Sequence, residues 1–348
     1  MGETNDLMIA SLGPYLAANV PELGTVRHFE KFGTGQSNPT YKLICDAGTF
    51  VLRTKPPGQL LKSAHLVERE FEVMQALADT PVPVPKMLHL ATDEASPLGR
   101  AFFVMEYLEG RVFFDPSLPE LDAGERASIY DAMADTLAAL HSVDVDAVGL
   151  SAFGKPGSYF ERQIDRWSRQ YLASVDVPDR GMRGIMDWLG LHVPDDDGQV
   201  ALVHGDFRLD NMMIAPDAPR VIALLDWELS TLGHPLADLA YQCMQWRLPH
   251  EGGMRGLGGV DRAELGLPSE REYIARYCAA RGIARPDNWP FYLVFSYFRL
   301  AAILQGVVAR AQGGNASNPE AARKYAAAIP VLIKQAVDIA HEPSEKAI

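Results

Sequence analysis

The sequence contains little cysteine, and its longest hydrophobic run is interrupted by a charge. The three cysteines among 348 residues form no CxxC pair, which excludes a disulfide framework and a cysteine zinc site. The apolar run from Trp289 to Ala309 has Arg299 at its middle, so it predicts a buried helix rather than a membrane span. The first residues lack the basic and apolar regions of a secretory signal. We therefore expect a cytoplasmic protein without a membrane partner.

Positive charge is also scarce. Lys and Arg number 32 against 45 Asp and Glu, which gives a formal net charge of −13. Proteins that bind nucleic acid hold its phosphates with clustered Lys and Arg, so this balance argues against a nucleic-acid partner but leaves a local basic pocket open. A hydrophobic fraction of 47% suffices for a large core, and the length predicts one large two-lobed unit or two domains.

The first third of the chain has the pattern of short strands around one helix. Three β-rich runs in residues 24–54 predict three strands. Apolar residues recur at helical spacing over Ser63–Ala78, with Ser63 as the N-cap. Two further strands are predicted at 86–90 and 101–108. The order is thus three strands, a helix and two strands.

Beyond Gly110 the sequence is mainly helical. Two predicted strands, 212–215 and 221–225, flank a turn with two prolines. The loop 250–268 has six glycines but no GxxxxGKS/T pattern, and we interpret it as mobile surface rather than as a phosphate cradle. Helical periodicity predicts helices over Ala123–His141, Tyr159–Leu172, Leu236–Trp246, Glu270–Arg281 and Trp289–Arg310.

The residues that point to chemistry lie in the segment HGDFRLDN, which begins at His204, and in Asp226. Asp206 and Asn211 are five residues apart, and Asp226 follows a second strand twenty residues after Asp206. Phosphoryl transfer needs a carboxylate that orients the acceptor hydroxyl and takes its proton, together with oxygen ligands that hold Mg²⁺ against the phosphates. We therefore predict that Asp206 is the catalytic residue and that Asn211 and Asp226 are the Mg²⁺ ligands.

These residues resemble the catalytic machinery of the aminoglycoside phosphotransferase and choline kinase superfamily, the small-molecule relatives of the protein kinases. HGDFRLDN takes the place of the HRD-type loop, and Asp226 takes that of the DFG aspartate. Residues 233–240 (GHPLADLA) look like the segment that follows the metal aspartate. In that segment Asp238 would be a structural acceptor that stabilises the catalytic loop. The resemblance covers Val20–Arg310.

The resemblance implies an α+β, protein-kinase-like fold of two lobes. The N-lobe, residues 1–107, would be a small antiparallel sheet of about five strands with one key helix, and it would bind the nucleotide. The C-lobe, residues 108–348, would be larger and mainly helical, with the catalytic loop and the acceptor site. ATP, the phosphoryl donor, would bind between the lobes with Mg²⁺.

The resemblance also assigns one loop of the N-lobe to the nucleotide. Gly33, Gly35 and Ser37 match the nucleotide-covering loop in position, although the GxGxxG pattern is partial because Asn38 replaces its third glycine. Backbone N–H groups and the Ser37 hydroxyl would face phosphate oxygens.

Two further matches concern the phosphates and the adenine. Arg53 and Glu70 match the kinase strand lysine and its helix carboxylate, with Arg in place of Lys. The guanidinium can bridge a phosphate and Glu70, although by itself the pair would be an ordinary salt bridge. Glu106 and Leu108 match the hinge, where the main chain would hydrogen-bond the adenine.

The histidines near the motif are interpreted as structural. His204 would brace the loop by hydrogen bonding, because the motif supplies no partner arrangement for a nucleophile or general base. His141 lies near the end of a predicted helix. Asp210 is expected to be solvated or capping, with an outer-shell role at the metal left open.

The candidates for the acceptor site are arginines. Arg162 and Arg166 share a helical face, and Arg299 lies in the apolar run. They are either solvated or salt-bridged, or they form a cationic wall for an anionic acceptor. The segments around them resemble the phosphotransferase module fused to some eukaryotic acyl-CoA dehydrogenases. That resemblance implies a hydroxyacyl-CoA-like thioester or another anionic metabolite as the acceptor, rather than an aminoglycoside.

We therefore predict an ATP- and Mg²⁺-dependent phosphotransferase, a small-molecule kinase that phosphorylates a hydroxyl group of its acceptor. The alternative is a nucleotide-binding pseudokinase that serves as an interaction module, but the intact Asp206, Asn211 and Asp226 count against it. A protein kinase is a weaker interpretation, because no APE-type segment follows Asp226.

Overall fold

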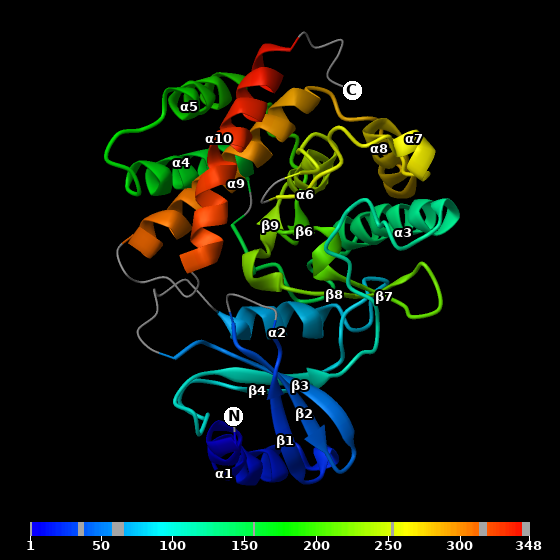
Figure 1. Ribbon diagram of the computed structural model, residues 1–348, viewed down its shortest axis with the longest axis vertical. Coiled ribbons are helices and arrows are strands. Elements are labelled where there is room, and N and C mark those ends of the chain that lie inside the picture. Colours follow the sequence, from blue (N-terminus) through cyan, green and yellow to red (C-terminus); the bar gives the residue numbers. More distant parts are fainter. Residues whose placement is uncertain are drawn as a thin grey trace. The chain divides into compact units, whose positions relative to one another are not determined.

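The structure, a computed structural model, describes residues 2–33, 38–57, 66–155, 157–251, 254–312 and 319–342. The fold is α+β, and the chain forms two compact units (Figure 1). The first unit comprises Met1–Gly110 and Ile222–Leu229, and the second comprises Arg111–Val221 and Ser230–Ile348. The segment that carries Asp226 therefore belongs to the first unit, although it lies far along the chain.

The first unit is built on an antiparallel sheet of five strands in the order β1-β2-β3-β5-β4. All five strands predicted for this part of the chain are present. The predicted helix is present as α2 (Val67–Ala76) but is shorter than the expected Ser63–Ala78: its N-cap is Leu66, and Ser63 lies outside the described residues. The strands are β1 (Val26–Lys31), β2 (Thr40–Cys45), β3 (Gly48–Thr54), β4 (Met87–Ala91) and β5 (Phe102–Glu106).

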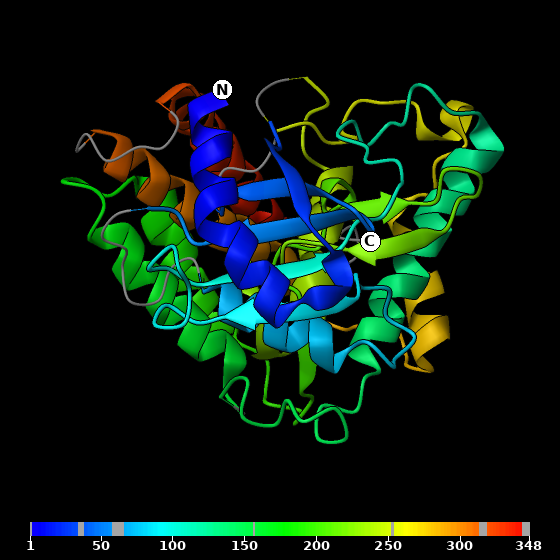
Figure 2. The same ribbon diagram turned by 90° about the horizontal axis from the view of Figure 1, so that it is seen from below.

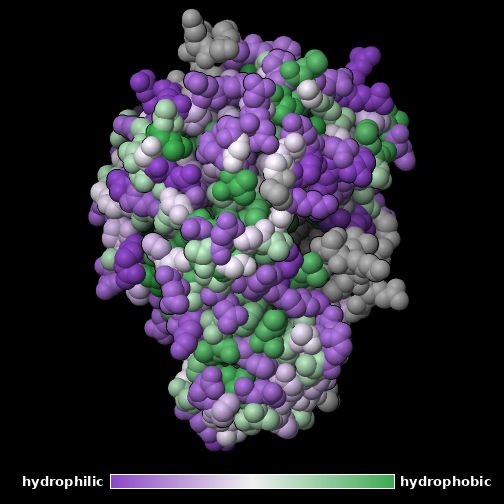
Figure 3. All heavy atoms as spheres, turned by 180° about the vertical axis from the view of Figure 1, so that it is seen from behind, coloured by the Kyte–Doolittle hydropathy of each residue, from purple (hydrophilic) through white to green (hydrophobic). Residues whose placement is uncertain are grey.

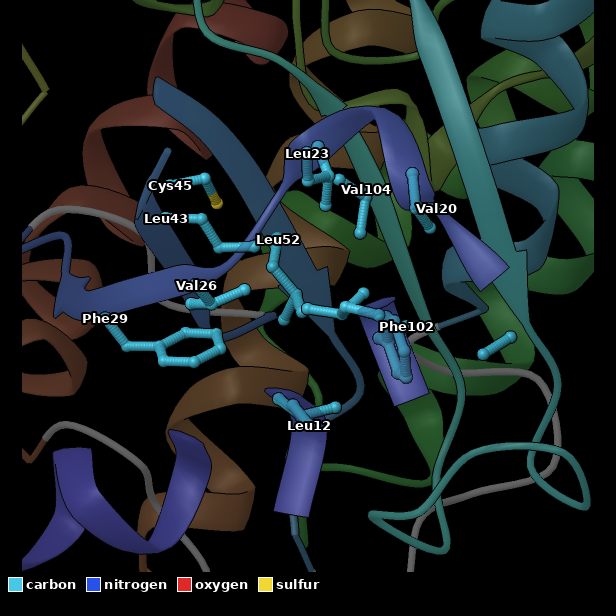
Figure 4. Packing of buried hydrophobic residues seen from close by; sticks show 12 residues of the cluster. Leu12, Val20, Leu23, Val26, Phe29, Leu43, Cys45, Leu52, Phe102 and Val104 are labelled. Atoms are coloured by element: carbon cyan, nitrogen blue, oxygen red, sulfur yellow. The ribbon is translucent and has the colours of Figure 1, made fainter. Parts of the chain in front are cut away.

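Helices cover both faces of this sheet. Successive side chains of a strand point to opposite faces, so Phe102 and Phe103 of β5 pack on different helices. Helix α1 (Gly2–Asn19) covers the face of Phe102, where Leu12 is fully buried (Figures 2 and 4). Helix α2 covers the other face, where the ring centres of Phe71 and Phe103 lie 6.3 Å apart.

The second unit is mainly helical, which confirms the predicted fold class. Helices α3, α4 and α8 have the predicted bounds, whereas the sequence pattern did not predict α1, α5, α10 and the four-residue α7, which lies in the expected loop 250–268. Helix α6 ends three residues earlier than predicted, because the last turn is a 3-10 helix, Met244–Trp246. The helices are α3 (Ala123–His141), α4 (Tyr159–Leu172), α5 (Arg180–His192), α6 (Leu236–Cys243), α7 (Arg262–Leu265), α8 (Glu270–Arg281), α9 (Trp289–Gln312) and α10 (Pro319–His341).

Helix α9 contains the long apolar run of the sequence. Its length and composition would allow it to cross a membrane, but 83% of its apolar window is buried inside the protein. Helices α4, α5, α6 and α10 pack around it. Arg299, at its middle, is 6% exposed. The prediction of a buried helix is confirmed.

Short strands hold the segment that contains the predicted catalytic motif. Strand β6 (Ala201–Val203) pairs antiparallel with β9 (Thr231–Gly233), and the motif begins at the residue after β6. Neither of these three-residue strands was predicted. Strands β7 (Met212–Ile214) and β8 (Val221–Leu224) confirm the two predicted strands that follow the motif.

Part of the glycine-rich loop 250–268 is packed in the interior. Leu257 is fully buried, and a Cβ added at Gly256 would lie 2.3 Å from the carbonyl oxygen of Leu248. The interpretation of this loop as surface is wrong for these residues, because the absence of side chains at glycine lets the backbone approach so closely.

Cysteine and most large hydrophobic side chains are kept from the surface. Cys45, Cys243 and Cys278 are free and buried. On the face shown in Figure 3, hydrophobic residues form small groups among polar ones. In the described part of the chain, Val177 and Leu191 are the most exposed large hydrophobic residues, at 83% and 82%.

Candidate active site

The loop that carries the motif is anchored by a buried carboxylate on α6. Asp238 accepts hydrogen bonds from the backbone N–H of His204 (2.6 Å) and of Gly205 (2.8 Å). Nε2 of His141 lies 3.4 Å from the same carboxylate. Burial alone would raise the pKa of Asp238, but the hydrogen bonds from His141 and from the backbone lower it below its ordinary value. The predicted role of Asp238 as a structural acceptor is confirmed.

Both histidines near the motif have structural contacts. His204 is fully buried, and its Nδ1 accepts the backbone N–H of Asp206 at 3.2 Å. Nδ1 of His141 lies 2.7 Å from the hydroxyl of Tyr277. Burial lowers the pKa of His141, which favours a neutral ring. This geometry confirms the interpretation of both residues as structural.

Asp206 has a partner on each carboxylate oxygen. The hydroxyl of Tyr241 donates to Oδ1 at 2.7 Å, and Nδ2 of Asn211 donates to Oδ2 at 2.9 Å and to the backbone carbonyl at 2.8 Å. Nε of Arg208 lies 3.3 Å from Oδ1. Burial alone would raise the pKa of Asp206, but the charge of Arg208 and the hydrogen bond from Tyr241 lower it. Asp206 is therefore held ionised, with 22% of its side chain exposed.

Arg208 and Tyr241 were not predicted from the sequence. Arg208 also forms an ion pair with Asp210 at 2.8 Å, so Asp210 is paired rather than merely solvated. A signal for Tyr241 does exist in the sequence. It lies three residues after Asp238, a spacing that places both side chains on the same face of α6.

The oxygens available for a cation are few. Both hydrogen bonds from Asn211 to Asp206 use its amide nitrogen, which leaves the amide oxygen as the atom suited to a metal. Within the described ranges, no group of three or more His, Cys, Asp or Glu is arranged to hold a metal ion. An amide oxygen is a ligand that Mg²⁺ accepts, since the ion takes most of its ligands from phosphates and water.

Arg53 joins Glu70 to Asp226 in the first unit. Its Nε lies 3.0 Å from Glu70 Oε2, and its Nη2 lies 2.7 Å from Asp226 Oδ1. Nδ2 of Asn38 also donates to Glu70, at 2.8 Å. Burial alone would lower the pKa of Arg53, but the charges of Glu70, Asp226 and Glu228 raise it. Arg53 is therefore not one half of an isolated salt bridge, because it also contacts a predicted metal ligand.

Glu70 and Asp226 differ in environment and conformation. Glu70 is 1% exposed, and burial raises its pKa although the charge of Arg53 opposes this shift. The backbone of Asp226 is left-handed, with φ of 63°. Outside glycine this conformation is uncommon, and Asp and Asn are among the residues that tolerate it. The backbone thus sets the direction of the Asp226 carboxylate, which is 34% exposed.

At the predicted hinge, the Glu106 side chain is hydrogen-bonded, whereas the backbone of Leu108 is open. The side chain of Glu106 accepts the backbone N–H of Lys86 at 2.6 Å, so it is already engaged in the sheet. The backbone N–H and C=O of Leu108 have no hydrogen-bond partner among the residues that the structure describes. A backbone that hydrogen-bonds adenine needs such open groups.

The predicted nucleotide-covering loop is described only at its start. Gly33 is exposed, and a Cβ added there would meet nothing within 4 Å. Gly35 and Ser37 lie outside the described residues. The role of this loop stays a prediction.

Two of the three candidate acceptor arginines lie against the same tryptophan. The guanidinium carbon of Arg166 is 5.0 Å, and that of Arg299 is 5.9 Å, from the ring centre of Trp167. Burial and the charge of Arg299 lower the pKa of Arg166. Arg162, in contrast, donates to the backbone carbonyl of Lys155 at 2.6 Å.

Arg299 is not an ordinary surface arginine, because it is 6% exposed. Among the residues that the structure describes, its Nε has no hydrogen-bond partner and no carboxylate forms an ion pair with it. Its guanidinium instead lies 5.7 Å from the ring centre of Tyr241, the residue that binds Asp206. The structure thus brings a buried cation to within one side chain of the predicted catalytic carboxylate.

Comparison with known proteins agrees with this geometry. The model of the phosphotransferase enzyme family matches residues 28–277. Acyl-CoA dehydrogenase family member 10 of Mus musculus is 48% identical over 292 residues, which cover 84% of this chain and 27% of that protein. Acyl-CoA dehydrogenase family member 11 of Rattus norvegicus is 43% identical over 317 residues, which cover 90% of this chain and 41% of that protein. The chain therefore spans less than half the length of these curated relatives.

Solved structures share the fold. A protein of Ralstonia eutropha JMP134, named provisionally as an aminoglycoside phosphotransferase, is 45% identical with a TM-score of 0.85, and the match covers 95% of this chain and 97% of that one. A thermostable mutant of aminoglycoside phosphotransferase APH(4)-Ia, in a ternary complex with ADP and hygromycin B, is 15% identical with a TM-score of 0.62, over 96% and 100% of the two chains. The kinase-like fold is confirmed, and the chain belongs to the phosphotransferase enzyme family.

Proposed function

We propose that this phosphotransferase moves the terminal phosphoryl group of ATP to a hydroxyl group of a small-molecule acceptor, with Mg²⁺. The observation that carries the proposal is the state of Asp206, an ionised and partly exposed carboxylate fixed by Tyr241 and Asn211. Phosphoryl transfer through a loose transition state needs a carboxylate that orients the attacking hydroxyl more than it needs a strong base. A lowered pKa suits such an orienting role.

The nucleotide contacts are assigned to residues with open or charged groups. Arg53 would bind phosphate oxygens, and the open backbone groups of Leu108 would bind the adenine. Asn211 and Asp226 would hold Mg²⁺, which neutralises charge on the phosphates when it is bound. The APH(4)-Ia structures that share this fold were solved with ADP or AMP-PNP, which supports ATP as the donor.

The acceptor is proposed to be anionic. Arg299 and Arg166 supply positive charge that no carboxylate of the described residues neutralises. An aminoglycoside is a polycation and would be repelled there, whereas a hydroxyacyl-CoA thioester or another anionic metabolite would be attracted. The similarity to acyl-CoA dehydrogenase family members 10 and 11 supports an acyl thioester among these.

The test is the variant Asp206→Ala in an assay with Mg-ATP and a set of hydroxyacyl-CoA thioesters. Loss of the orienting carboxylate should lower the rate of phosphoryl transfer at least about 1,000-fold, because positioned acid–base groups contribute on this scale. Binding of Mg-ATP, measured by calorimetry, should change less than about twofold, since Asp206 orients the acceptor hydroxyl and does not hold the nucleotide.

Asp187→Ala is the matched control, because Asp187 is an exposed carboxylate on α5 that forms no ion pair with the residues the structure describes, and it should keep the wild-type rate. Unchanged turnover in Asp206→Ala would contradict the proposal. Mg-ATP binding without transfer to any acceptor in the wild-type protein would instead identify a nucleotide-binding interaction module.

A further inference from the structure

Tyr241 makes two contacts that no other described side chain combines. It lies on α6 and is 5% exposed, and its hydroxyl donates to Asp206 Oδ1 at 2.7 Å. Asn211 binds Oδ2, and at Oδ1 the Tyr241 hydroxyl supplies the short hydrogen bond, where Nε of Arg208 lies farther away at 3.3 Å. A carboxylate held at both oxygens cannot rotate about its terminal bond.

The ring of Tyr241 carries the second contact. The guanidinium carbon of Arg299 lies 5.7 Å from the centre of that ring and 5.9 Å from that of Trp167. A buried cation without a carboxylate partner is costly, and the faces of aromatic rings compensate only part of this cost. The uncompensated Nε of Arg299 therefore points to an anionic ligand group at this position.

We propose that Tyr241 is a positioning residue that couples the anionic group of the acceptor, bound at Arg299, to the orientation of Asp206. The inference rests on the proposed function. One rigid aromatic side chain makes both contacts. When the Arg299 guanidinium moves towards a bound anion, the Tyr241 ring shifts with it, and so does the hydroxyl that binds Asp206. An acceptor that lacks the anionic group would lose turnover as well as affinity, because the binding energy of the remote group then no longer contributes to the transition state.

The test separates the hydroxyl from the ring. Tyr241→Phe removes the hydroxyl and keeps the ring under Arg299. In the Mg-ATP assay with hydroxyacyl-CoA thioesters, kcat should fall about 10- to 100-fold, while KM for the acceptor should change less than about twofold. Arg299→Met should raise KM and also lower kcat. In the double variant, the effect of Arg299→Met on kcat should vanish, because its path to Asp206 is already broken.

Tyr130→Phe is the matched control. It removes another buried tyrosine hydroxyl, which donates to the carbonyl of Pro116 at 2.7 Å, and it should leave kcat and KM unchanged. A loss of kcat equal to that in Tyr241→Phe would show that any such deletion acts through general destabilisation, and it would overturn the inference.

Two other results would also overturn it. One is a kcat of Tyr241→Phe within about twofold of the wild type, and the other is strict additivity of the two substitutions on kcat. If the wild-type protein transfers no phosphoryl group, the proposed function fails, and a crystal structure of Tyr241→Phe then decides the inference separately. The carboxylate of Asp206 should leave its present orientation, and an unchanged orientation would refute the positioning role.

Discussion

At the scale of single residues, the catalytic loop depends on Asp238. Both of its oxygens accept a backbone N–H, one from His204 and one from Gly205. Asp238→Asn replaces one acceptor by a donor, so one of these N–H groups would face an N–H₂ group in the interior. We expect the free energy of unfolding to fall by about 3 kcal/mol, as measured by chemical denaturation at neutral pH.

The same substitution at Asp217 is the control. Asp217 is exposed in the turn between β7 and β8 and has no hydrogen-bond or ion-pair partner in the described part of the chain, so Asp217→Asn should change the stability by less than about 0.5 kcal/mol. Equal stabilities of the two variants would show that the buried carboxylate does not anchor the loop.

The catalytic candidates were accessible from the sequence to different degrees. Asp206 and Asn211 lie in one loop, where spacing along the chain translates directly into spacing in the structure. Tyr241 reaches Asp206 across 35 positions, so only the tertiary structure brings the two together. Its proximity could be anticipated only from its place one helical turn after Asp238.

At the scale of elements, strong local signals explain two of the three helices that were predicted within their exact bounds. Helix α3 is capped at its N-terminus by Asp122, whose side chain accepts the backbone N–H of Glu125. Helix α8 begins with a capping box formed by Ser269 and Glu272, and ends at Gly282 in the left-handed conformation. In both helices the local sequence and the tertiary structure favour the same ends.

The three long helices that were not predicted contain residues that oppose helix formation. Pro14 lies inside α1 and Pro330 inside α10, and α5 contains Gly181 and Gly184. Proline removes a helical hydrogen bond and glycine costs backbone entropy, so local propensity argues against a helix at each place. In these helices the burial of an apolar face outweighs the low helix propensity, and Leu332 of α10 is fully buried.

Two glycines should respond to alanine in opposite directions. A Cβ at Gly233 in β9 would lie 2.4 Å from the ring of Tyr159, so Gly233→Ala must displace that ring and should destabilise the protein by about 1–3 kcal/mol. At Gly184 in α5 a Cβ would meet nothing within 4 Å, so Gly184→Ala should stabilise it by about 0.5–1 kcal/mol.

Thermal and chemical unfolding of the two variants measure both changes side by side. The opposite signs make the comparison its own control, because a general effect of added bulk would shift both variants the same way. Destabilisation of both proteins would contradict the close contact between β9 and Tyr159 as the cause.

At the scale of the whole molecule, the chain consists of two compact units and matches less than half of relatives that are named as acyl-CoA dehydrogenases. The kinase-like fold was predictable because the motif residues resemble a known family over most of the chain. That residues 222–229 belong to the first unit could not be predicted, since no local sequence pattern marks a segment that leaves one unit and packs in the other.

The three cysteines are distributed unequally between these units. Cys45 belongs to the first, and Cys243 and Cys278 belong to the second. Burial raises the pKa of all three, that of Cys45 to about 11, so the reactive thiolate is rare in the folded protein. We expect a coloured thiol reagent to modify the native protein at less than about a hundredth of the rate of the unfolded chain.

Modification of any thiol at the unfolded rate under native conditions would contradict this expectation. If the thiols are protected as expected, the scarcity of cysteine has a practical consequence. In rising denaturant, one equivalent of released dye reports the opening of the first unit and two equivalents report that of the second. Counting the modified thiols in the unmutated protein therefore shows whether the two units unfold together or one before the other.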